Sequence, residues 1–482
     1  MTAPTQVGTS EGVFHWLVQD VLTNQSPVDI YERFHQEENS VFLDSGILMF
    51  GLSRYSFIAR DPFLTFTSKG NNVTIKTDKQ TKHLENIDPF SILAELLSKY
   101  QIPRHPDLPP LLGGIIGYFG YDLGYIIEKL PGKSKDELQI SDCQFGFYDT
   151  VIIFDHLLGK TLIASTGFPE LDPQKRRERA QQRIEEHVSL ISRVFTPSPI
   201  QAPPSRQGKI DSNFKKEDYI VALKNVIEYI FAGDIFQANM TQRFQSTLFE
   251  SPFSLYKRLR AINPAPCASF LHFPDVTVAS SSPERYLLVK GKSVETRPIK
   301  GTRPRGKDPE SDDANRKELW ESVKDRAELT MIIDLERNDL GRVCSYGSVK
   351  VPDLFRLEEF PSVFHLVSTI VGTLEEDKSV IDLVKASFPG GSITGAPKVR
   401  SMEIIDELEP QRRNIYTGSI GYIDFSGDAD LNIVIRTFVI KNNIAYFSAG
   451  GGITAGSDPQ LEYEETLHKA RSLMRALGHE AT

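Results

Sequence analysis

Phe388-Pro-Gly-Gly-Ser-Ile-Thr-Gly-Ala-Pro-Lys398 is a run of glycine, proline and small polar residues that ends on a lysine. Turns of this kind hold functional side chains and backbone amides on a rigid scaffold. Four more segments of the C-terminal half combine Gly/Pro turns with polar or charged residues, and they cover residues 233–242, 282–286, 328–341 and 450–459. We therefore expect the chemistry of this protein to lie in its C-terminal half.

A lysine stands on a similar turn in Arg297-Pro-Ile-Lys300-Gly-Thr302, shortly after a carboxylate in Ser282-Pro-Glu284-Arg285. A lysine that burial keeps partly neutral is a nucleophile toward electron-poor carbon. Most of the 55 lysines and arginines of such a chain are solvated surface charges. The hexapeptide alone therefore does not predict a functional lysine; the other segments have to be considered with it.

The composition is that of an ordinary globular protein. Of the 482 residues, 40% are hydrophobic and 25% are charged, which suits two or three domains or one large composite fold. The net charge is −9, and no run of Lys and Arg is interleaved with aromatic residues, which argues against a nucleic-acid binder. An anionic substrate would need a locally positive pocket built from particular cations or backbone amides.

Cys143, Cys267 and Cys344 are far apart and show no CxxC spacing, so they predict neither a zinc site nor a disulfide framework. No apolar run reaches the roughly 18 residues that a membrane-spanning helix needs. The first residues, Met1-Thr-Ala-Pro, lack the basic and apolar regions of a signal peptide. We therefore expect a reduced protein in the cytoplasm.

The chain divides into three sequence regions. Residues 1–165 are rich in short β-prone runs broken by turn residues, among them 40–43, 55–59, 64–67, 72–76 and 150–154. Residues 166–211 hold a strongly charged helix, which we expect to be solvated, and a proline-rich linker. Residues 212–482 mix helix and strand, with helices expected over 216–232 and 462–477.

Glycine recurs every three residues at Gly114, Gly117 and Gly120. The order is not the GxGxxG of a dinucleotide-binding loop, and no acidic residue follows a βαβ unit. Close packing of strands is the favoured interpretation of these glycines.

Together the five segments resemble those of the chorismate-utilising enzymes, a family that includes anthranilate, aminodeoxychorismate, isochorismate and salicylate synthases. The resemblance covers about residues 25–165 and 212–476, and its motifs are long and ordered. It implies an α+β fold, a large antiparallel β-sandwich with helices packed outside. It also implies an active site in the cleft between these layers.

The resemblance implies a Mg²⁺ ion that holds the ring carboxylate of chorismate. Glu328 and Glu465 match the family's metal ligands, and Glu462 would assist through water. Few protein carboxylates, completed by waters and substrate oxygens, suit Mg²⁺. Glu462 and Glu465 share a helix face at i,i+3. Without the resemblance, a solvated acidic helix face would be the better interpretation.

The same resemblance implies that the other carboxylate of chorismate is bound by Arg436 and by the backbone N–H groups of Gly450, Gly451 and Gly452. A guanidinium matches a carboxylate in bidentate fashion, and consecutive glycines let backbone amides surround an anion. Lys398 and His365 are expected to line the same pocket, although a lone histidine is more often structural.

Glu284 matches the family's general acid. Displacement of the ring C4 hydroxyl requires protonation of a poor leaving group, so this carboxyl has to carry a proton when the substrate is bound. Burial would raise its pKa in that direction. The competing interpretation is an ion pair between Glu284 and Arg285.

Two positions distinguish the members of the family. Members that add water use a lysine base where this chain has Gln237, and glutamine cannot deprotonate water. Anthranilate synthases carry alanine where this chain has Lys300, whereas aminodeoxychorismate synthases carry lysine. The resemblance therefore implies a transferase that makes 4-amino-4-deoxychorismate, the precursor of p-aminobenzoate and folate, through a covalent lysine intermediate. Anthranilate synthase is the alternative, and a non-catalytic chorismate-binding relative would have lost Glu284 or the metal ligands.

Feedback by tryptophan is in doubt for this chain. Anthranilate synthases bind tryptophan with Leu-Leu-Glu-Ser and Asn-Pro-Ser-Pro-Tyr motifs, where this chain has Leu43-Asp-Ser45 and Asn263-Pro-Ala-Pro-Cys267. Cys267 lacks the aromatic face expected there. A buried, non-regulatory tryptophan, as some aminodeoxychorismate synthases hold, is the alternative.

No Gly-x-Cys-x-Gly segment surrounds the three cysteines, so the chain contains no glutaminase nucleophile. Ammonia would come free or from a separate glutamine amidotransferase subunit, and we expect a heterodimer with that subunit.

Overall fold

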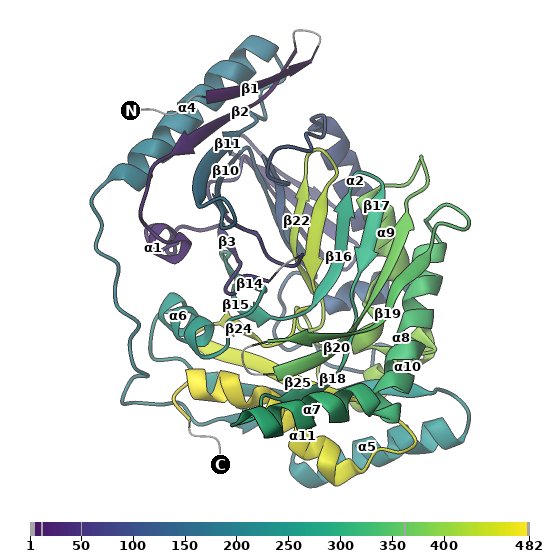
Figure 1. The fold of residues 1–482 in the computed structure, drawn as a ribbon. Coiled ribbons are helices and arrows are strands. Elements are labelled where there is room, and N and C mark those ends of the chain that lie inside the picture. Colours follow the sequence, from purple (N-terminus) through teal and green to yellow (C-terminus); the bar gives the residue numbers. More distant parts are fainter. Residues whose placement is uncertain (1–4, 11–12, 50, 361–362, 480–482) are drawn as a thin grey trace.

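The computed structural model describes residues 5–10, 13–49, 51–360 and 363–479. Two large antiparallel sheets pack face to face, and helices lie around them (Figure 1). The expected α+β fold with antiparallel sheets is therefore confirmed. Met1–Pro4, on which the signal-peptide argument rests in part, lie outside the described residues.

Thirteen of the described strands form the first sheet, and every pair in it is antiparallel. Their spatial order is β1 (Thr5–Ser10), β2 (Val13–Val21), β11 (Lys160–Ser165), β10 (Thr150–Asp155), β4 (Tyr55–Ala59), β3 (Ser40–Asp44), β14 (Cys267–His272), β15 (Thr277–Ser282), β24 (Thr437–Lys441), β25 (Ile444–Ile453), β13 (Gln237–Thr247) and β12 (Asp211–Ser212), with β21 (Gly395–Ala396) also paired to β13.

Twelve of the described strands form the second sheet. Their order is β18 (Ile299–Pro304), β20 (Val363–Thr373), β17 (Ser293–Thr296), β16 (Arg285–Lys290), β23 (Ala429–Asn432), β22 (Ser419–Asp424), β8 (Gly114–Phe119), β9 (Cys143–Tyr148), β5 (Leu64–Lys69), β6 (Asn72–Thr77) and β7 (Thr81–Leu84), with β19 (Lys350–Glu359) paired to β20.

Many of the helices begin with Asp or Ser at the N-cap and proline at the next position, as α4, α6 and α11 do. The cap side chain satisfies a free backbone N–H, and proline loses nothing where its missing N–H has no helical partner. The described helices are α1 (Pro27–Tyr31), α2 (Pro89–Lys99), α3 (Gly124–Ile127), α4 (Pro173–Ser192), α5 (Lys216–Phe231), α6 (Pro252–Ile262), α7 (Pro309–Glu321), α8 (Val323–Gly341), α9 (Val380–Ser387), α10 (Lys398–Leu408) and α11 (Pro459–Ala476), with 3₁₀ turns η1 (Tyr121–Leu123) and η2 (Gly391–Ile393).

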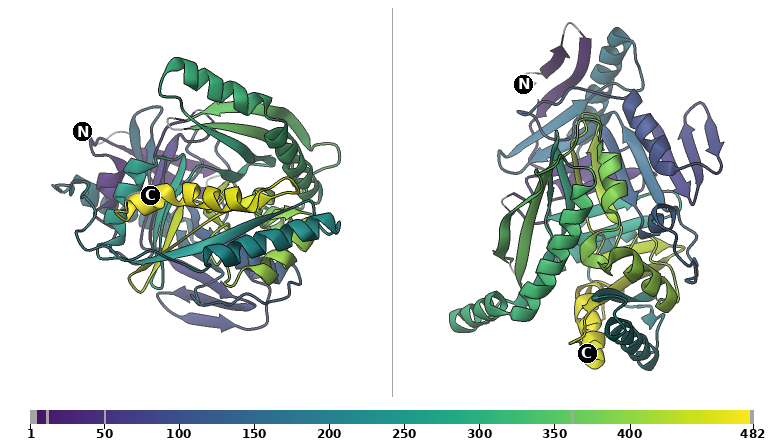
Figure 2. Two further views of the ribbon diagram at one scale, coloured as in Figure 1. Left: turned by 90° about the horizontal axis from the view of Figure 1, so that it is seen from below. Right: turned by 90° about the vertical axis from the view of Figure 1, so that its right-hand side faces the viewer.

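The main core lies between the two sheets. Phe57 of β4 and Tyr422 of β22 meet there edge to face, with ring centroids 5.4 Å apart. A second core lies between the other face of the first sheet and helices α4, α6 and α11. Figure 2 shows α5 and α11 side by side at the end of the molecule that carries β13 and β25.

Strands from both ends of the sequence meet in each sheet. β3 pairs with β14 in the first sheet, and β8 pairs with β22 in the second. The glycines of β8 permit this close pairing, because a Cβ at Gly117 would stand 1.9 Å from the carbonyl oxygen of Gln144 and one at Gly114 would stand 2.3 Å from that of Ile423. The interpretation of these glycines as packing residues is confirmed.

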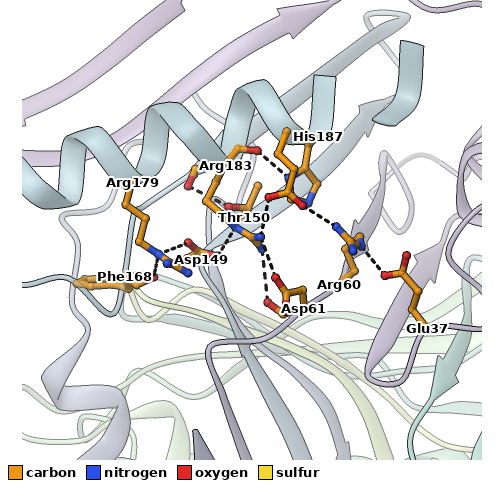
Figure 3. A network of polar contacts seen from close by, with 11 residues as sticks. Glu37, Arg60, Asp61, Asp149, Thr150, Phe168, Arg179, Arg183 and His187 are labelled. Carbon is orange, nitrogen blue, oxygen red and sulfur yellow. Dashed lines mark hydrogen bonds and ion pairs between the residues drawn. The ribbon is translucent and has the colours of Figure 1, made fainter. Parts of the chain in front are cut away.

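The charged helix α4 is solvated on one face alone. On its other face Arg183 and His187 are buried, and Arg179 and Arg183 both pair with Asp149, a carboxylate with no exposed surface (Figure 3). Arg183 also pairs with Asp61 at the end of β4. The charges of the run therefore fix α4 to the first sheet.

The strands expected in residues 1–165 are all present as β3, β4, β5, β6 and β10, and the expected helices are α5 and α11. None of the described helices combines the length and apolar character that a membrane span requires.

Candidate active site

Lys300 lies on β18, next to a bulge in the pairing with β20. The register shifts between Lys300 and Thr302, and Gly301 between them has φ +78°. Glycine tolerates this backbone, and a bulge redirects the neighbouring side chain. A Cβ at Gly452 of β25 would stand 3.2 Å from the Lys300 amine and 2.7 Å from Nε2 of Gln237. The bulge therefore brings Lys300 from the second sheet to β13 and β25 of the first.

The surroundings of Lys300 favour an uncharged amine. Burial lowers the pKa of Lys300 below its ordinary value, against the attraction of Glu328, while the charge of Lys469 acts in the same direction as burial. Glu284 and Glu465 also face it and oppose the shift. A neutral amine is the form that attacks carbon.

Gln237 begins β13 and has no exposed surface. Both polar atoms of its side chain are buried and lack a hydrogen-bond partner among the described residues. Because an unpaired buried amide costs free energy, this side chain is available to a ligand beside Lys300.

Glu284 follows β15 and is 6% exposed. Burial raises the pKa of its carboxyl to about 7, although the Ser392 hydroxyl, the charge of Lys300 and the backbone N–H of Ile299 favour ionisation. Arg285 pairs instead with Asp430, at 2.9 Å, and with Glu295. Glu284 is thus a carboxyl that can carry a proton near neutral pH, and the interpretation as an ion pair with Arg285 is wrong.

The three predicted metal ligands approach one another from α8 and α11. A Cβ at Gly451 would stand 3.1 Å from a carboxylate oxygen of Glu462 and 3.7 Å from one of Glu465. Burial raises the pKa of Glu328 and of Glu462; the charge of Glu462 adds to the rise for Glu328, and the charge of Glu465 adds to the rise for Glu462. For Glu465 burial is outweighed by Lys469, so its pKa is lowered.

These carboxyls suit a divalent cation that brings its own water. Oε1 of Glu328 is buried without a hydrogen-bond partner among the described residues, and an ion pair at 3.9 Å joins it to the amine of Lys324. Glu462 accepts a hydrogen bond from Ser457, and Glu465 pairs with Lys469 at 2.6 Å. Within the described ranges no group of three or more His, Cys, Asp or Glu side chains is arranged so that it could hold a metal ion.

Arg436 and His365 lie near each other at the edge of this group. Arg436 has φ +54°, a left-handed conformation that is unusual outside glycine, and its guanidinium donates to the carbonyl oxygen of Lys469. Burial and then Arg436 lower the pKa of His365 to about 4. Its Nδ1 lies 2.9 Å from the Thr302 hydroxyl, so His365 is a neutral imidazole that contacts the strand of Lys300.

Lys398 begins α10 and is already held by protein groups. Its amine donates to Asp339 at 2.5 Å and to the carbonyl oxygen of Ser387 at 2.6 Å. Gly450, Gly451 and Gly452 lie in β25 and pair with β13. Along the described chain β24 pairs with β25 only from Ile444 to Phe447, so no β24 pairing reaches the other backbone edge of the glycines, where Lys469 donates to the carbonyl oxygen of Gly450.

Sequence reasoning missed two residues of this group. Lys469 of α11 pairs with Glu465, donates to the carbonyl oxygen of Gly450 at 2.9 Å and acts on both Lys300 and Glu284. Its signal was the i,i+4 spacing from Glu465. Ser392, which faces Glu284, lies inside the quoted segment 388–398 but shows no distinguishing pattern.

A cavity of about 660 Å³ lies elsewhere, between the N-terminal strands and β14. Asp44 and Ser45 line it together with Pro266 and Cys267. They belong to the two segments compared with the tryptophan motifs, and Asp44 and Cys267 are positions at which the sequence departs from those motifs.

Comparison with known proteins agrees with this architecture. A model of the chorismate binding enzymes matches residues 51–475. Aminodeoxychorismate synthase component 1 of Escherichia coli is 40% identical over 459 residues, 95% of this chain and 97% of the relative. Anthranilate synthase component 1 of Thermus thermophilus is 38% identical over 456 residues, 94% of this chain and 95% of the relative. The crystal structure of anthranilate synthase component I from Streptococcus pneumoniae has a TM-score of 0.76 and 31% identity, and the match covers 89% of this chain and 94% of that one.

Proposed function

Because this chain belongs to the family of chorismate binding enzymes, we propose that it is an aminodeoxychorismate synthase component I. It would convert chorismate and ammonia to 4-amino-4-deoxychorismate, the precursor of p-aminobenzoate and folate. Relatives named aminodeoxychorismate synthase and relatives named anthranilate synthase share similar sequence identity with this chain, 40% and 38%. The choice between them therefore depends on the residues of the site.

The observation that carries the proposal is the amine of Lys300 beside Gln237 and Gly452, with Glu284 in the same group. The amine attacks C2 of chorismate, the ring double bonds shift, and the C4–O bond breaks. Glu284 gives its proton to the departing hydroxyl, which leaves as water. Ammonia then bonds to C4, the bonds shift back, and the C2–N bond breaks to release Lys300 as a neutral amine. A proton of the new ammonium group at C4 returns to Glu284.

Glu328 and Glu465 would hold Mg²⁺, with Glu462 assisting through water, and the ion would neutralise the ring carboxylate of the substrate. Oε1 of Glu328 accepts no hydrogen bond among the described residues, which supports this assignment. Arg436, the glycines of β25, His365 and Lys398 are the candidates for the second carboxylate. Lys398 is paired with Asp339, so a role for Lys398 at the carboxylate would require that ion pair to break.

Ammonia would come from a separate glutamine amidotransferase subunit, since no glutaminase segment occurs in the sequence. The component number in the names of the relatives supports a multi-subunit enzyme. The partner would form a heterodimer with this chain.

Variants at Lys300 test the proposal. With chorismate, Mg²⁺ and an ammonium salt, Lys300→Arg should make almost no 4-amino product, because arginine keeps the charge and loses the nucleophile. Lys300→Ala opens C2 to ammonia, so its product should shift toward 2-amino-2-deoxyisochorismate or anthranilate. Lys317→Ala, at an exposed lysine of α7, is the matched control and should behave as wild type.

Chromatography with mass spectrometry identifies the products. Unchanged 4-amino product from Lys300→Ala at substantial rate would refute the covalent route. Anthranilate from the wild-type chain would identify it as an anthranilate synthase instead.

A further inference from the structure

Glu336 is a buried carboxyl in the segment 328–341 that the proposed mechanism does not use. It lies on α8, two turns beyond Glu328, and is 8% exposed. Its Oε2 accepts a hydrogen bond of 3.0 Å from the hydroxyl of Thr296. A buried glutamate normally requires a partner or a function, and Thr296 is a neutral partner that leaves the carboxyl without a counterion.

The contacts of Glu336 lead to both segments that face Glu284. Thr296 ends β17, and three residues further along the chain lies Ile299, whose N–H faces the Glu284 carboxyl. On the other side, a Cβ at Gly391 would stand 3.5 Å from Cγ of Glu336. The next residue, Ser392, presents its hydroxyl to Glu284. Glu336 thus lies behind the two donors of the general acid.

The charges around Glu336 keep it neutral. Burial raises the pKa of Glu336 to about 8, the Thr296 hydroxyl opposes the rise, and Glu284 and Asp339 add to it. The groups that face Glu336 or Glu284 from neighbouring elements are Asp339 on α8, Lys398 on α10, Tyr286 on β16, Lys300 on β18 and Lys469 on α11.

A neutral Glu336 matters when Glu284 reacts. After Glu284 gives its proton to the leaving hydroxyl it becomes a carboxylate, and an ionised neighbour in the same low-dielectric interior would oppose that charge. A protonated Glu336 adds no such repulsion.

We propose that Glu336 is a positioning residue for Glu284: it holds Thr296 and the Gly391–Ser392 turn in place and supplies an uncharged carboxyl behind the general acid. The inference rests on the proposed function in so far as Glu284 acts as that acid. It does not depend on which product this chain forms after the C4 hydroxyl has left.

Two substitutions separate positioning from packing. Glu336→Gln keeps a neutral hydrogen-bond acceptor for Thr296 and should retain kcat near pH 7. Glu336→Leu fills the space without an acceptor and should lower kcat at least about tenfold, a typical effect of misplacing a general acid, with little change in the KM for chorismate. Thr296→Val breaks the same hydrogen bond from the other side and should match Glu336→Leu, which covers the case that the leucine variant fails to fold.

The pH profile provides a reading that packing would not change. In the wild type, Glu336 loses its proton at a pKa of about 8, which lowers the fraction of enzyme with a neutral Glu336. Glu336→Gln has no group that titrates there. At fixed free ammonia the rate ratio of Glu336→Gln to wild type should therefore rise to about tenfold one pH unit above that pKa. Asp334→Asn, at an exposed carboxyl of the same helix, is the matched control and should keep a constant ratio.

A constant ratio for Glu336→Gln, or full kcat for Glu336→Leu, would overturn the proposal. Product identity from the same reactions tests the proposed function separately. The protonation state can also be measured without turnover: the infrared band of protonated carboxyls at pH 7 should lose intensity in Glu336→Gln. An unchanged band would overturn the inference even if the products confirmed the enzyme.

Discussion

Glu284→Gln should stabilise the folded protein increasingly as the pH rises. The folded pKa of about 7 lies above the ordinary value of 4.5, so the folded chain keeps a proton that the unfolded chain has released. The stability contributed by this group is complete below pH 4.5 and is lost as the pH rises through 7. Glutamine does not titrate and avoids that loss.

The magnitude follows from the shift. A difference of about 2.5 pKa units corresponds to about 3.4 kcal/mol, of which about 2.5 kcal/mol falls between roughly pH 5 and pH 8. An unfolding entropy of about 2.1 cal/mol/K per residue gives about 1 kcal/mol/K for 482 residues. The melting temperature of Glu284→Gln relative to wild type should therefore rise by about 2–3 °C over this pH range.

The assay is thermal unfolding of the chain in matched buffers without substrate, followed by calorimetry. Glu464→Gln, at an exposed carboxyl on α11, is the control and should keep a constant offset from wild type. A constant offset for Glu284→Gln would show that Glu284 ionises like a solvated glutamate, and it would remove the physical basis for a protonated general acid. The same variant should have lost nearly all aminodeoxychorismate formation, so greater stability would accompany lower activity.

Two further predictions concern the metal and the nitrogen source. Glu328→Gln and Glu465→Gln should each raise the Mg²⁺ concentration for half-maximal activity by more than about tenfold, the loss that even outer-shell partners can cause, whereas Glu464→Gln should not; coincident Mg²⁺ titrations would contradict the ligand assignment. The purified chain should convert chorismate with an ammonium salt at alkaline pH but not with glutamine. Addition of a class I glutaminase subunit should restore the use of glutamine. Product formed from glutamine by the chain alone would show that it contains a glutaminase nucleophile, against the prediction.

The fold could be predicted from the sequence through resemblance more than through periodicity. The alternation of apolar and polar residues in short strands such as β5 predicts their alternating burial. Asp-Pro or Ser-Pro pairs mark the starts of α4, α6 and α11. The order of strands within each sheet has no local signal, because pairs such as β8 with β22 join segments about 300 residues apart. The burial of one face of α4 also depended on Asp149, a distant residue.

For the site, too, the motif residues could be predicted from the sequence, whereas features that depend on tertiary structure could not. Residues inside the motifs, such as Lys300 and Glu284, could be named because the family pattern marks them. The bulge at Gly301, which directs Lys300 toward β13, depends on register with β20 and is not visible in the hexapeptide. Glu336 could not be singled out, because its meaning depends on burial against Thr296 and Gly391 and not on any sequence pattern.

The charges of the site explain why a covalent lysine and a metal ion would belong together. Glu328, Glu462 and Glu465 bring three carboxyls to the neighbourhood of Lys300, and chorismate would add two carboxylates. Glu465 is partly exposed and paired with Lys469, whereas Glu328 and Glu462 are more deeply buried, and a buried charge without compensation costs several kcal/mol. In the proposed mechanism Lys300 would not be the counterion, because an amine that attacks carbon has to be uncharged. Mg²⁺ would supply positive charge that cannot be lost as a proton, so a nucleophilic Lys300 would make the proposed metal site more necessary.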